Sequence, residues 1–152
     1  MAGDGSLGED KGGLVRRDVV TAFVRCEGRL LLLRRSERVG SYRGRWAAVS
    51  GYLEDSEPLS QALREIAEET GIPAERLQLT ARAAPLRVPA PERGTLWVVH
   101  PFLFDLARPI PEIQLDWESS ELRWAAPEEI GRLDTVPRLM ETWQACADAE
   151  HG

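Results

Sequence analysis

Three glutamates lie close together near the end of the most regular helical segment, in the run LREIAEETGI (residues 63–72). Residues three and four apart share one side of a helix, so Glu65, Glu68 and Glu69 are expected to form one acidic patch. Like charges at this spacing destabilise a helix by roughly 0.2–0.5 kcal/mol per pair, and the helix dipole disfavours anions in the last turn. Carboxylates kept together at this cost are typical of a site for a hard cation such as Mg²⁺; a solvated acidic face is the alternative.

The residues just before this patch strengthen the metal hypothesis. The segment SGYLEDSE (residues 50–57) supplies Gly51, Glu54, Asp55 and Glu57, so backbone carbonyls and further carboxylates lead into the same surface. Cysteine and histidine do not occur in this segment, which argues against zinc.

The helix that carries the patch is predicted over residues 57–70. Ser56 is a candidate N-cap, Pro58 lies in the first turn, and Gly71 is a typical helix stop. Its apolar positions recur at i, i+3, i+4 and i+7 and must face a core (Leu59, Ala62, Leu63 and Ile66). The opposite side is expected to be polar (Glu57, Gln61, Arg64, Glu65, Glu68 and Glu69).

The other elements mix strand and helix patterns without strict alternation. Strands are expected at residues 19–24, 29–34, 46–54, 77–89 and 95–106, the last as an edge or bulged strand because it contains Pro101. Residues 116–130 are expected to hold a loop, a short strand and a helix start, and residues 135–149 a terminal helix with Leu139 and Trp143 on its apolar side. This order favours an α/β fold with a mixed sheet between helices.

Composition narrows the class of protein. A chain of 152 residues, 43% of them hydrophobic, suits one compact domain, expected over residues 14–152 after a glycine-rich disordered segment over residues 1–13. No apolar run approaches the roughly 20 residues of a membrane helix. Cys26 and Cys146 are far apart, which favours reduced thiols and a cytoplasmic location. The net charge of −6 argues against non-specific binding to nucleic acid.

An arginine-rich segment interrupts this acidic chain. The run RRSERVGSYRGR (residues 34–45) holds five arginines and one glutamate and is expected to form a loop after the second strand. It is either a solvated loop or a source of donors for anionic groups.

The segment GYLEDSEPLSQALREIAEETGI (residues 51–72) resembles the Nudix box, the signature of the Nudix hydrolases. Gly51, five residues and Glu57 match its first half, and the run from Arg64 to Ile72 matches its second half completely; six residues separate the halves, where the family has seven. The likeness extends over most of the chain, through Arg45-Trp46 and the run ELRWAAPEEI (residues 121–130). Residues 31–54 are also similar to Nudix domains joined to an initiation-factor-2B-like domain, although no such extra domain is expected here.

This resemblance implies a Nudix-type α/β/α sandwich. It also implies a hydrolase that cleaves the diphosphate linkage of a nucleoside diphosphate linked to another group X, such as an ADP-ribose-like compound, a dinucleotide or a nucleoside triphosphate. The cofactor would be Mg²⁺, with Mn²⁺ as a substitute. Its ligands would be the three box glutamates and a backbone carbonyl (Glu65, Glu68, Glu69 and Gly51).

The resemblance assigns further roles around this metal site. Arg64 would orient the carboxylates. The missing residue leaves open whether Glu57 supports Arg64, as the corresponding glutamate does in the family, or whether Glu54 or Asp55 takes its place.

For the general base and for the substrate contacts, the sequence offers several candidate residues each. The base is either a box glutamate such as Glu68 or an acid of a later loop, Glu118 or Glu121, with Asp116 behind them; each loop acid could instead face solvent. Phosphate groups would favour arginine donors from the loop (Arg34, Arg35, Arg43 or Arg45). Trp46 and Trp97 could stack on a base, although buried tryptophans usually fill cores.

Two other functions are open. The shortened box also fits a Nudix-fold regulatory module that binds a nucleotide without cleaving it. An isomerase of isoprenoid diphosphates is less favoured, because neither cysteine lies beside the box. The expected partner is a small nucleotide rather than a membrane or a nucleic acid, and the resemblance adds that Nudix domains often form homodimers.

Overall fold

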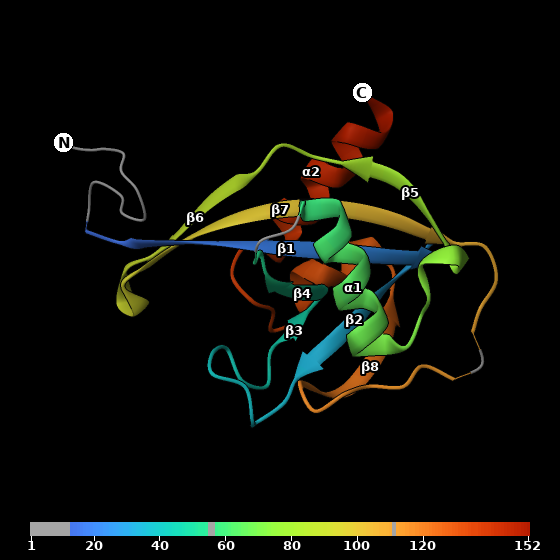
Figure 1. The fold of residues 1–152 in the computed structure, drawn as a ribbon, viewed down its shortest axis with the longest axis horizontal. Coiled ribbons are helices and arrows are strands. Elements are labelled where there is room, and N and C mark those ends of the chain that lie inside the picture. The colour runs from blue at the N-terminus through green and yellow to red at the C-terminus, as the bar shows by residue number, and fades with distance from the viewer. Residues whose placement is uncertain (1–12, 55–56, 111) are drawn as a thin grey trace.

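A mixed sheet lies between two helices in the part of the chain that the structure, a computed structural model, describes: residues 13–54, 57–110 and 112–152 (Figure 1). Strand β1 pairs in parallel with β7 and antiparallel with β2 and β4. Strand β2 also pairs with β3 and β8, and β7 with β5 and β6. This is the expected α/β sandwich with a mixed central sheet. The strands and helices are β1 (Val15–Cys26), β2 (Arg29–Arg35), β3 (Trp46–Ala47), β4 (Val49–Tyr52), α1 (Pro58–Thr70), β5 (Leu77–Arg82), β6 (Leu86–Ala90), β7 (Thr95–Leu106), β8 (Ser119–Ala125) and α2 (Leu139–His151), with 3-10 turns η1 (Ala74–Arg76), η2 (Pro91–Arg93) and η3 (Pro127–Arg132).

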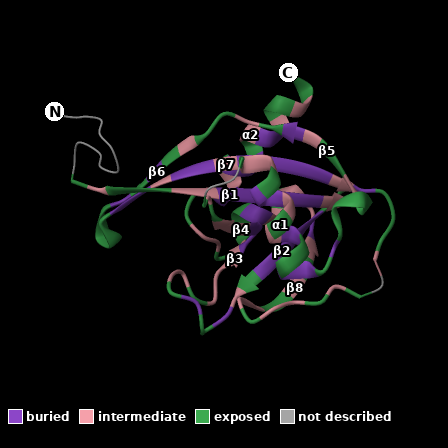
Figure 2. Cartoon of the chain, viewed as in Figure 1, coloured by how far each residue is buried: buried purple, intermediate pink, exposed green. Residues whose placement is uncertain are grey.

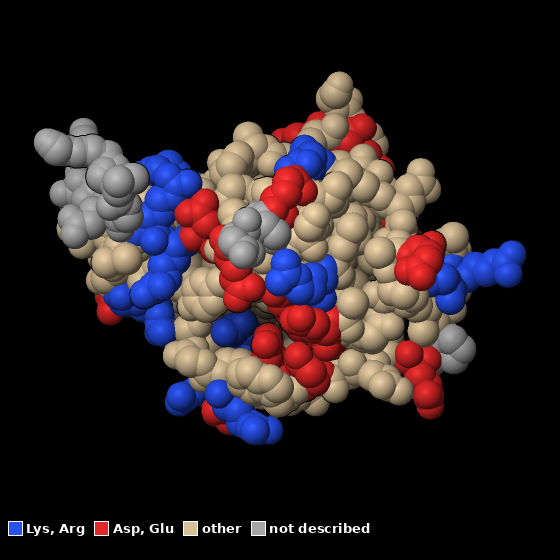
Figure 3. Space-filling model, in the orientation of Figure 1, with Lys and Arg blue, Asp and Glu red and all other residues tan. Residues whose placement is uncertain are grey.

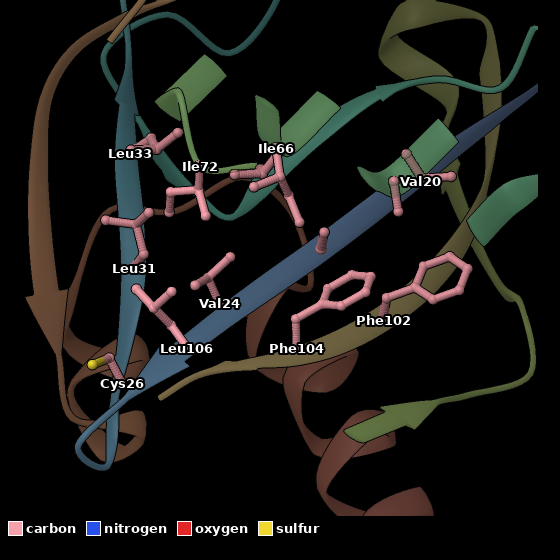
Figure 4. Packing of buried hydrophobic residues seen from close by; sticks show 13 residues of the cluster. Val20, Val24, Cys26, Leu31, Leu33, Ile66, Ile72, Phe102, Phe104 and Leu106 are labelled. Atoms are coloured by element: carbon pink, nitrogen blue, oxygen red, sulfur yellow. The ribbon is translucent and has the colours of Figure 1, made fainter. Parts of the chain in front are cut away.

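Alternation along the long strands gives the sheet two buried faces (Figure 2). Val20 and Val24 of β1 pack with Ile66 of α1 on one face, where Figure 4 shows their side chains converging with those of β2 and β7. Phe23 points to the other face and meets Trp143 of α2 edge-on, with the ring centroids 5.5 Å apart. Because neighbouring strand residues point to opposite faces, a single apolar strand holds both helices in place.

Helix α1 differs from the prediction at its first residue. Ser56 lies outside the described residues, and the N-cap is Glu57, whose carboxylate accepts hydrogen bonds from the backbone N–H groups of Leu59 (2.9 Å) and Ser60 (3.3 Å). The expectation that Ser56 caps the helix was therefore wrong, because a carboxylate one residue later satisfies the free N–H groups. Gly71 ends the helix at φ 78°, as predicted, in the left-handed conformation that glycine tolerates.

Two segments that were each expected to form one strand form two strands instead. Residues 46–54 form β3 and β4, and residues 77–89 fall into β5 and β6. Pro101 was expected to mark either an edge strand or a bulge. The edge strand was wrong, since β7 pairs on both sides, whereas the ladder between β5 and β7 does shift its register, between Leu79 and Ala81. Pro101 pairs with Thr21 of β1, but its carbonyl accepts from the Ala83 N–H on the other side, in the gap between the end of β5 at Arg82 and the start of β6 at Leu86. The N–H that proline lacks would face this gap and not a strand.

The remaining expectations concern the termini and the thiols. The segment expected to be disordered, residues 1–13, lies outside the described residues except for Gly13. Cys26 and Cys146 are both buried and unpaired, as predicted. Within the described ranges, no helix is long and apolar enough to cross a membrane.

Candidate active site

The end of α1 carries three carboxylates that are buried to different degrees. Glu68 is exposed, Glu65 is half-buried, and Glu69 is only 4% exposed. The side chains of Glu65 and Glu69 share a hydrogen bond. Burial raises the pKa of both, and burial together with the negative charges of Glu118, Glu65 and Asp116 raises the pKa of Glu69 to about 10. Glu69 is thus protonated at neutral pH, and among the described residues its Oε2 has no hydrogen-bond partner.

Gly51 of β4 lets this carboxylate cluster approach the sheet. A Cβ built at position 51 would clash with the carboxyl group of Glu65 and lie 2.6 Å from its Oε1. The Glu65 carboxyl group therefore lies directly against the Gly51 backbone, in space that any other residue would fill. This is the backbone group that the family resemblance assigns to the metal.

The shortened box changes which acid meets Arg64. Arg64 Nη1 lies 3.5 Å from Oε1 of Glu54. Glu57 instead caps the helix and lies 3.3 Å from Nη2 of Arg82. The structure places Glu54, one of the alternatives that the sequence left open, beside Arg64, while Asp55 lies outside the described residues.

The loop before β8 brings Glu118 to the box carboxylates. Ser36 fixes this loop, because its backbone N–H donates to the Glu118 carbonyl and its hydroxyl donates to the Trp117 carbonyl, each at 2.8 Å. Burial, Asp116 and Glu65 raise the pKa of Glu118, against the lowering effect of Arg35. Glu118 and Asp116 are therefore the later acids whose charges act on the box glutamates.

A cavity of about 620 Å³ lies beside this cluster. Its lining includes four acidic side chains, Glu54, Glu65, Glu68 and Glu118, and Arg35. Figure 3 shows the acidic side chains gathered over α1 next to a hollow in the surface. The Arg35 guanidinium is half-buried and donates to the Ser41 carbonyl at 2.8 Å. An arginine held in this way is suited to bind a phosphate oxygen.

Aromatic and basic side chains also line the cavity. The rings of Tyr52 and Trp97 lie 6.2 Å apart, and Trp97 Nε1 donates to the Tyr42 hydroxyl at 3.2 Å. Arg93 lies 5.0 Å from the centre of the Tyr42 ring, and Arg17 is a further basic lining residue. Trp97 was a predicted stacking residue, whereas the two tyrosines were missed. The position of Tyr52 directly after the box glycine could have pointed to it; Tyr42 gives no such signal.

Six predicted site residues are not among the described residues that line this cavity: Arg64 and Glu69 of the box, and Arg34, Arg45, Trp46 and Glu121. Arg34 and Glu121 are both exposed and form an ion pair with each other at 2.7 Å. Arg45 contacts the Thr135 carbonyl at 3.4 Å, and Trp46 packs against the core beside α2. Of these neighbouring candidates, Arg35 and Glu118 therefore line the cavity, whereas Arg34 and Glu121 do not.

The donors fit a hard divalent cation in their chemistry. They are carboxylates, one of them with an unpartnered buried oxygen on Glu69, next to a glycine backbone against which Glu65 is packed. In the described ranges, no group of three His, Cys, Asp or Glu side chains is arranged so that it could hold a metal ion as it stands. Binding would require that Glu69 lose its proton and that the side chains turn toward a common point.

Comparison with known proteins decides the family. The model of the NUDIX domain matches residues 15–145 of the chain. The chain belongs to the Nudix family. The helix with its three glutamates, the glycine before it and the mixed sheet are therefore those of a Nudix domain.

Individual relatives are distant. The chain is 31% identical over 102 residues to a protein of Mycobacterium tuberculosis named putative 8-oxo-dGTP diphosphatase 3; this match covers 66% of the chain and 46% of the relative, about half of its length. It is 28% identical to the nucleoside triphosphatase NudI of an Enterobacter species, over 78% of the chain and 88% of that protein. The crystal structure of a MutT protein from Methanosarcina mazei Go1 matches with a TM-score of 0.70 and 26% identity, over 94% of this chain and 97% of that one.

Proposed function

We propose that this Nudix domain is a divalent-metal-dependent hydrolase that cleaves the diphosphate linkage of a nucleoside diphosphate linked to X, where X gives an ADP-ribose-like compound, a dinucleotide or a nucleoside triphosphate. The observation that carries the proposal is that one cavity joins the box glutamates Glu65 and Glu68 to the aromatic surface of Tyr52 and Trp97. The phosphate groups of a nucleotide need the first of these environments, and its base needs the second. The relatives named as an 8-oxo-dGTP diphosphatase and a nucleoside triphosphatase support a nucleoside triphosphate among these substrates.

The residues of this chain divide the work of such a reaction. When bound to Glu65, Glu68, Glu69 and the Gly51 carbonyl, a divalent cation would neutralise the phosphate charge and lower the pKa of a bound water. Arg35, which lines the same cavity, would bind a phosphate oxygen.

Two further residues would act on the proton and on the ligands. Glu118 would accept the proton of the attacking water, since its raised pKa brings it nearer the operating pH of a general base. Arg64, paired with Glu54, would hold helix α1 in a fixed position relative to the loop that follows β4.

A substrate panel tests the proposal. The purified chain is incubated with ADP-ribose, a dinucleoside polyphosphate, ordinary nucleoside triphosphates and 8-oxo-dGTP, with Mg²⁺, with Mn²⁺ and with a chelator, and the products are identified by mass spectrometry. We expect cleavage within the diphosphate group of at least one compound, dependent on added metal. Turnover that is unaffected by the chelator would contradict the metal assignment.

Arg35 and Arg34 provide a matched test of the substrate contacts. Arg35→Gln is expected to raise KM by about 10-fold or more, because a charge-assisted hydrogen bond contributes about 1.5–3 kcal/mol. Arg34→Gln removes an exposed ion pair with Glu121, which is worth about 0–1 kcal/mol, and a hydrogen bond from Nε to the Gly44 carbonyl, and is expected to leave KM nearly unchanged because neither contact lies in the cavity lining. Equal effects of the two substitutions on KM would show that Arg35 does not contact the substrate.

A regulatory module that binds a nucleotide without cleaving it is the second candidate. It is favoured by the shortened box and by the proton that Glu69 retains in the arrangement described. Metal-insensitive nucleotide binding, measured by calorimetry, with no turnover anywhere in the panel would support this alternative over hydrolysis.

Several finer points belong to the proposal as well. We propose Mg²⁺ as the physiological ion, a single domain over residues 14–152, a cytoplasmic location and a homodimer, which light scattering would detect. The similarity of residues 31–54 to Nudix domains joined to an initiation-factor-2B-like domain stays a prediction.

A further inference from the structure

Gln61 is a polar residue whose side chain the fold buries. The helix pattern predicted it on the polar side of α1, yet only 1% of it is exposed. It precedes Glu65 by one helical turn, and its Nε2 donates a hydrogen bond to Glu65 Oε2 at 2.7 Å. A buried amide must have hydrogen-bond partners, and here one partner is the first glutamate of the acidic cluster.

The other end of the same amide contacts the loop that follows β4. The backbone N–H of Glu54 donates to Gln61 Oε1 at 3.4 Å. These two contacts agree on one orientation of the amide, because the flipped amide would place its oxygen against the Glu65 carboxylate and its NH₂ group against an N–H donor. Gln61 therefore links the box loop to Glu65.

Gln61 contacts both the loop of Glu54 and Glu65 in this shortened box. Glu57, the acid that the family pattern places before the helix, is engaged with the first helical N–H groups and with Arg82. Glu54, whose N–H contacts Gln61, also meets Arg64. Gln61 and Glu54 thus join the two halves of the box by contacts within this chain.

We propose that Gln61 is a positioning residue of the metal site, which holds the Glu65 carboxylate against Gly51 and ties it to the loop of Glu54. The inference rests on the proposed function, since Gln61 acts only through Glu65. Without the amide, Glu65 keeps its hydrogen bond with Glu69 and is free to rotate away from the Gly51 backbone. Hydrogen-bond partners of metal ligands typically contribute about 10–100-fold to metal affinity.

Mn²⁺ binding without substrate tests this role. Gln61→Met keeps the length of the side chain and removes the hydrogen bonds to Glu65 and to the Glu54 N–H, and Gln61→Glu keeps the acceptor for the Glu54 N–H but removes the donor to Glu65. We expect the Kd for Mn²⁺, measured by isothermal titration calorimetry, to rise about 10–100-fold in both variants. In turnover assays, kcat of Gln61→Met is expected to recover as the Mn²⁺ concentration is raised.

The chain offers a matched control. Gln144 on α2 donates to Asp148 at 3.0 Å with the same spacing of four residues, on the surface and away from the cavity. Gln144→Met is expected to bind Mn²⁺ like the wild type. Thermal unfolding of all four proteins separates a loss of stability from a loss of metal affinity.

The outcomes separate this inference from the proposed function. If the wild type binds no Mn²⁺, the proposed hydrolase fails and the inference fails with it. If the wild type binds Mn²⁺ and a folded Gln61 variant binds it equally well, only the inference is overturned. Failure of both Gln61 variants to fold would show that the amide serves stability, and would also overturn it.

Discussion

Replacing Gly51 with alanine is expected to lower kcat/KM by about 100-fold or more while leaving the fold intact. The new methyl group would occupy the space taken by the carboxyl group of Glu65. The displaced atoms are the far end of a flexible side chain, and Gly51 does not have a positive φ, so the backbone can accept alanine. Displacing a group of the reaction by about 1 Å can cost about 100-fold in rate.

Gly131→Ala is the control for this substitution. A Cβ at position 131 would meet Met140 Cε at an ordinary 3.6 Å. Steady-state kinetics on the substrate found in the panel, together with thermal unfolding, compare the two variants. We expect both to unfold within a few degrees of the wild type and only Gly51→Ala to lose activity. A Gly51→Ala enzyme with normal kcat/KM would show that the position of Glu65 against this backbone does not matter for turnover.

The sequence predicted the parts of the site that depend on local spacing. The helix, its glycine stop and the common side of Glu65, Glu68 and Glu69 follow from a period of 3.6 residues, and the structure has all of them. How deeply each glutamate is buried does not follow from that period. The burial of Glu69 and Gln61 depends on how closely α1 packs against β4 and the loop before β8, which is a property of the whole fold.

The parts of the site that depend on pairing between distant strands could not be predicted. Arg34 and Arg35 are adjacent, and their relative positions depend on where the ladder between β2 and β8 shifts its register, which occurs between these two residues. Tyr52 meets Trp97 because β4 and β7 both pair with β1. Such registers are fixed by packing between segments far apart in the chain, so the pairing of Tyr52 with Trp97 could not be predicted, although Trp97 itself was a candidate.

Glu69→Gln is expected to stabilise the metal-free protein at alkaline pH and to abolish its metal-dependent activity. Glu69 is buried with an unpartnered oxygen among the described residues, and its pKa is about 10 against a usual 4.5. Because the folded state holds this proton more tightly than the unfolded state, the stabilising contribution is fully present below about pH 4.5 and is lost as the pH rises toward 10. Glutamine has a similar shape and does not titrate.

The gain from glutamine should therefore grow with pH. Each pKa unit corresponds to about 1.4 kcal/mol, so the difference in unfolding free energy between Glu69→Gln and the wild type should increase by up to that amount for each pH unit between 5 and 8. At this chain length, 1 kcal/mol shifts Tm by about 2–4 °C. Glu65 and Glu118 also have raised pKa values, but they titrate in both proteins and do not account for the difference.

Glu68→Gln tests the loss of a metal-binding carboxylate without the effect that burial has on Glu69. Glu68 lines the same cavity but is exposed, so its replacement is expected to lower kcat by about 100–1000-fold, as loss of charge stabilisation in a transition state does, without a gain in Tm that grows with pH.

Thermal melts at pH 5 and pH 8, with and without Mn²⁺, compare both variants with the wild type. Mn²⁺ should raise the Tm of the wild type more at pH 8 than at pH 5, since binding must displace the Glu69 proton. A Glu69→Gln protein that keeps full activity, or whose advantage in Tm is the same at both pH values, would show that this buried carboxylate is not kept for a cation.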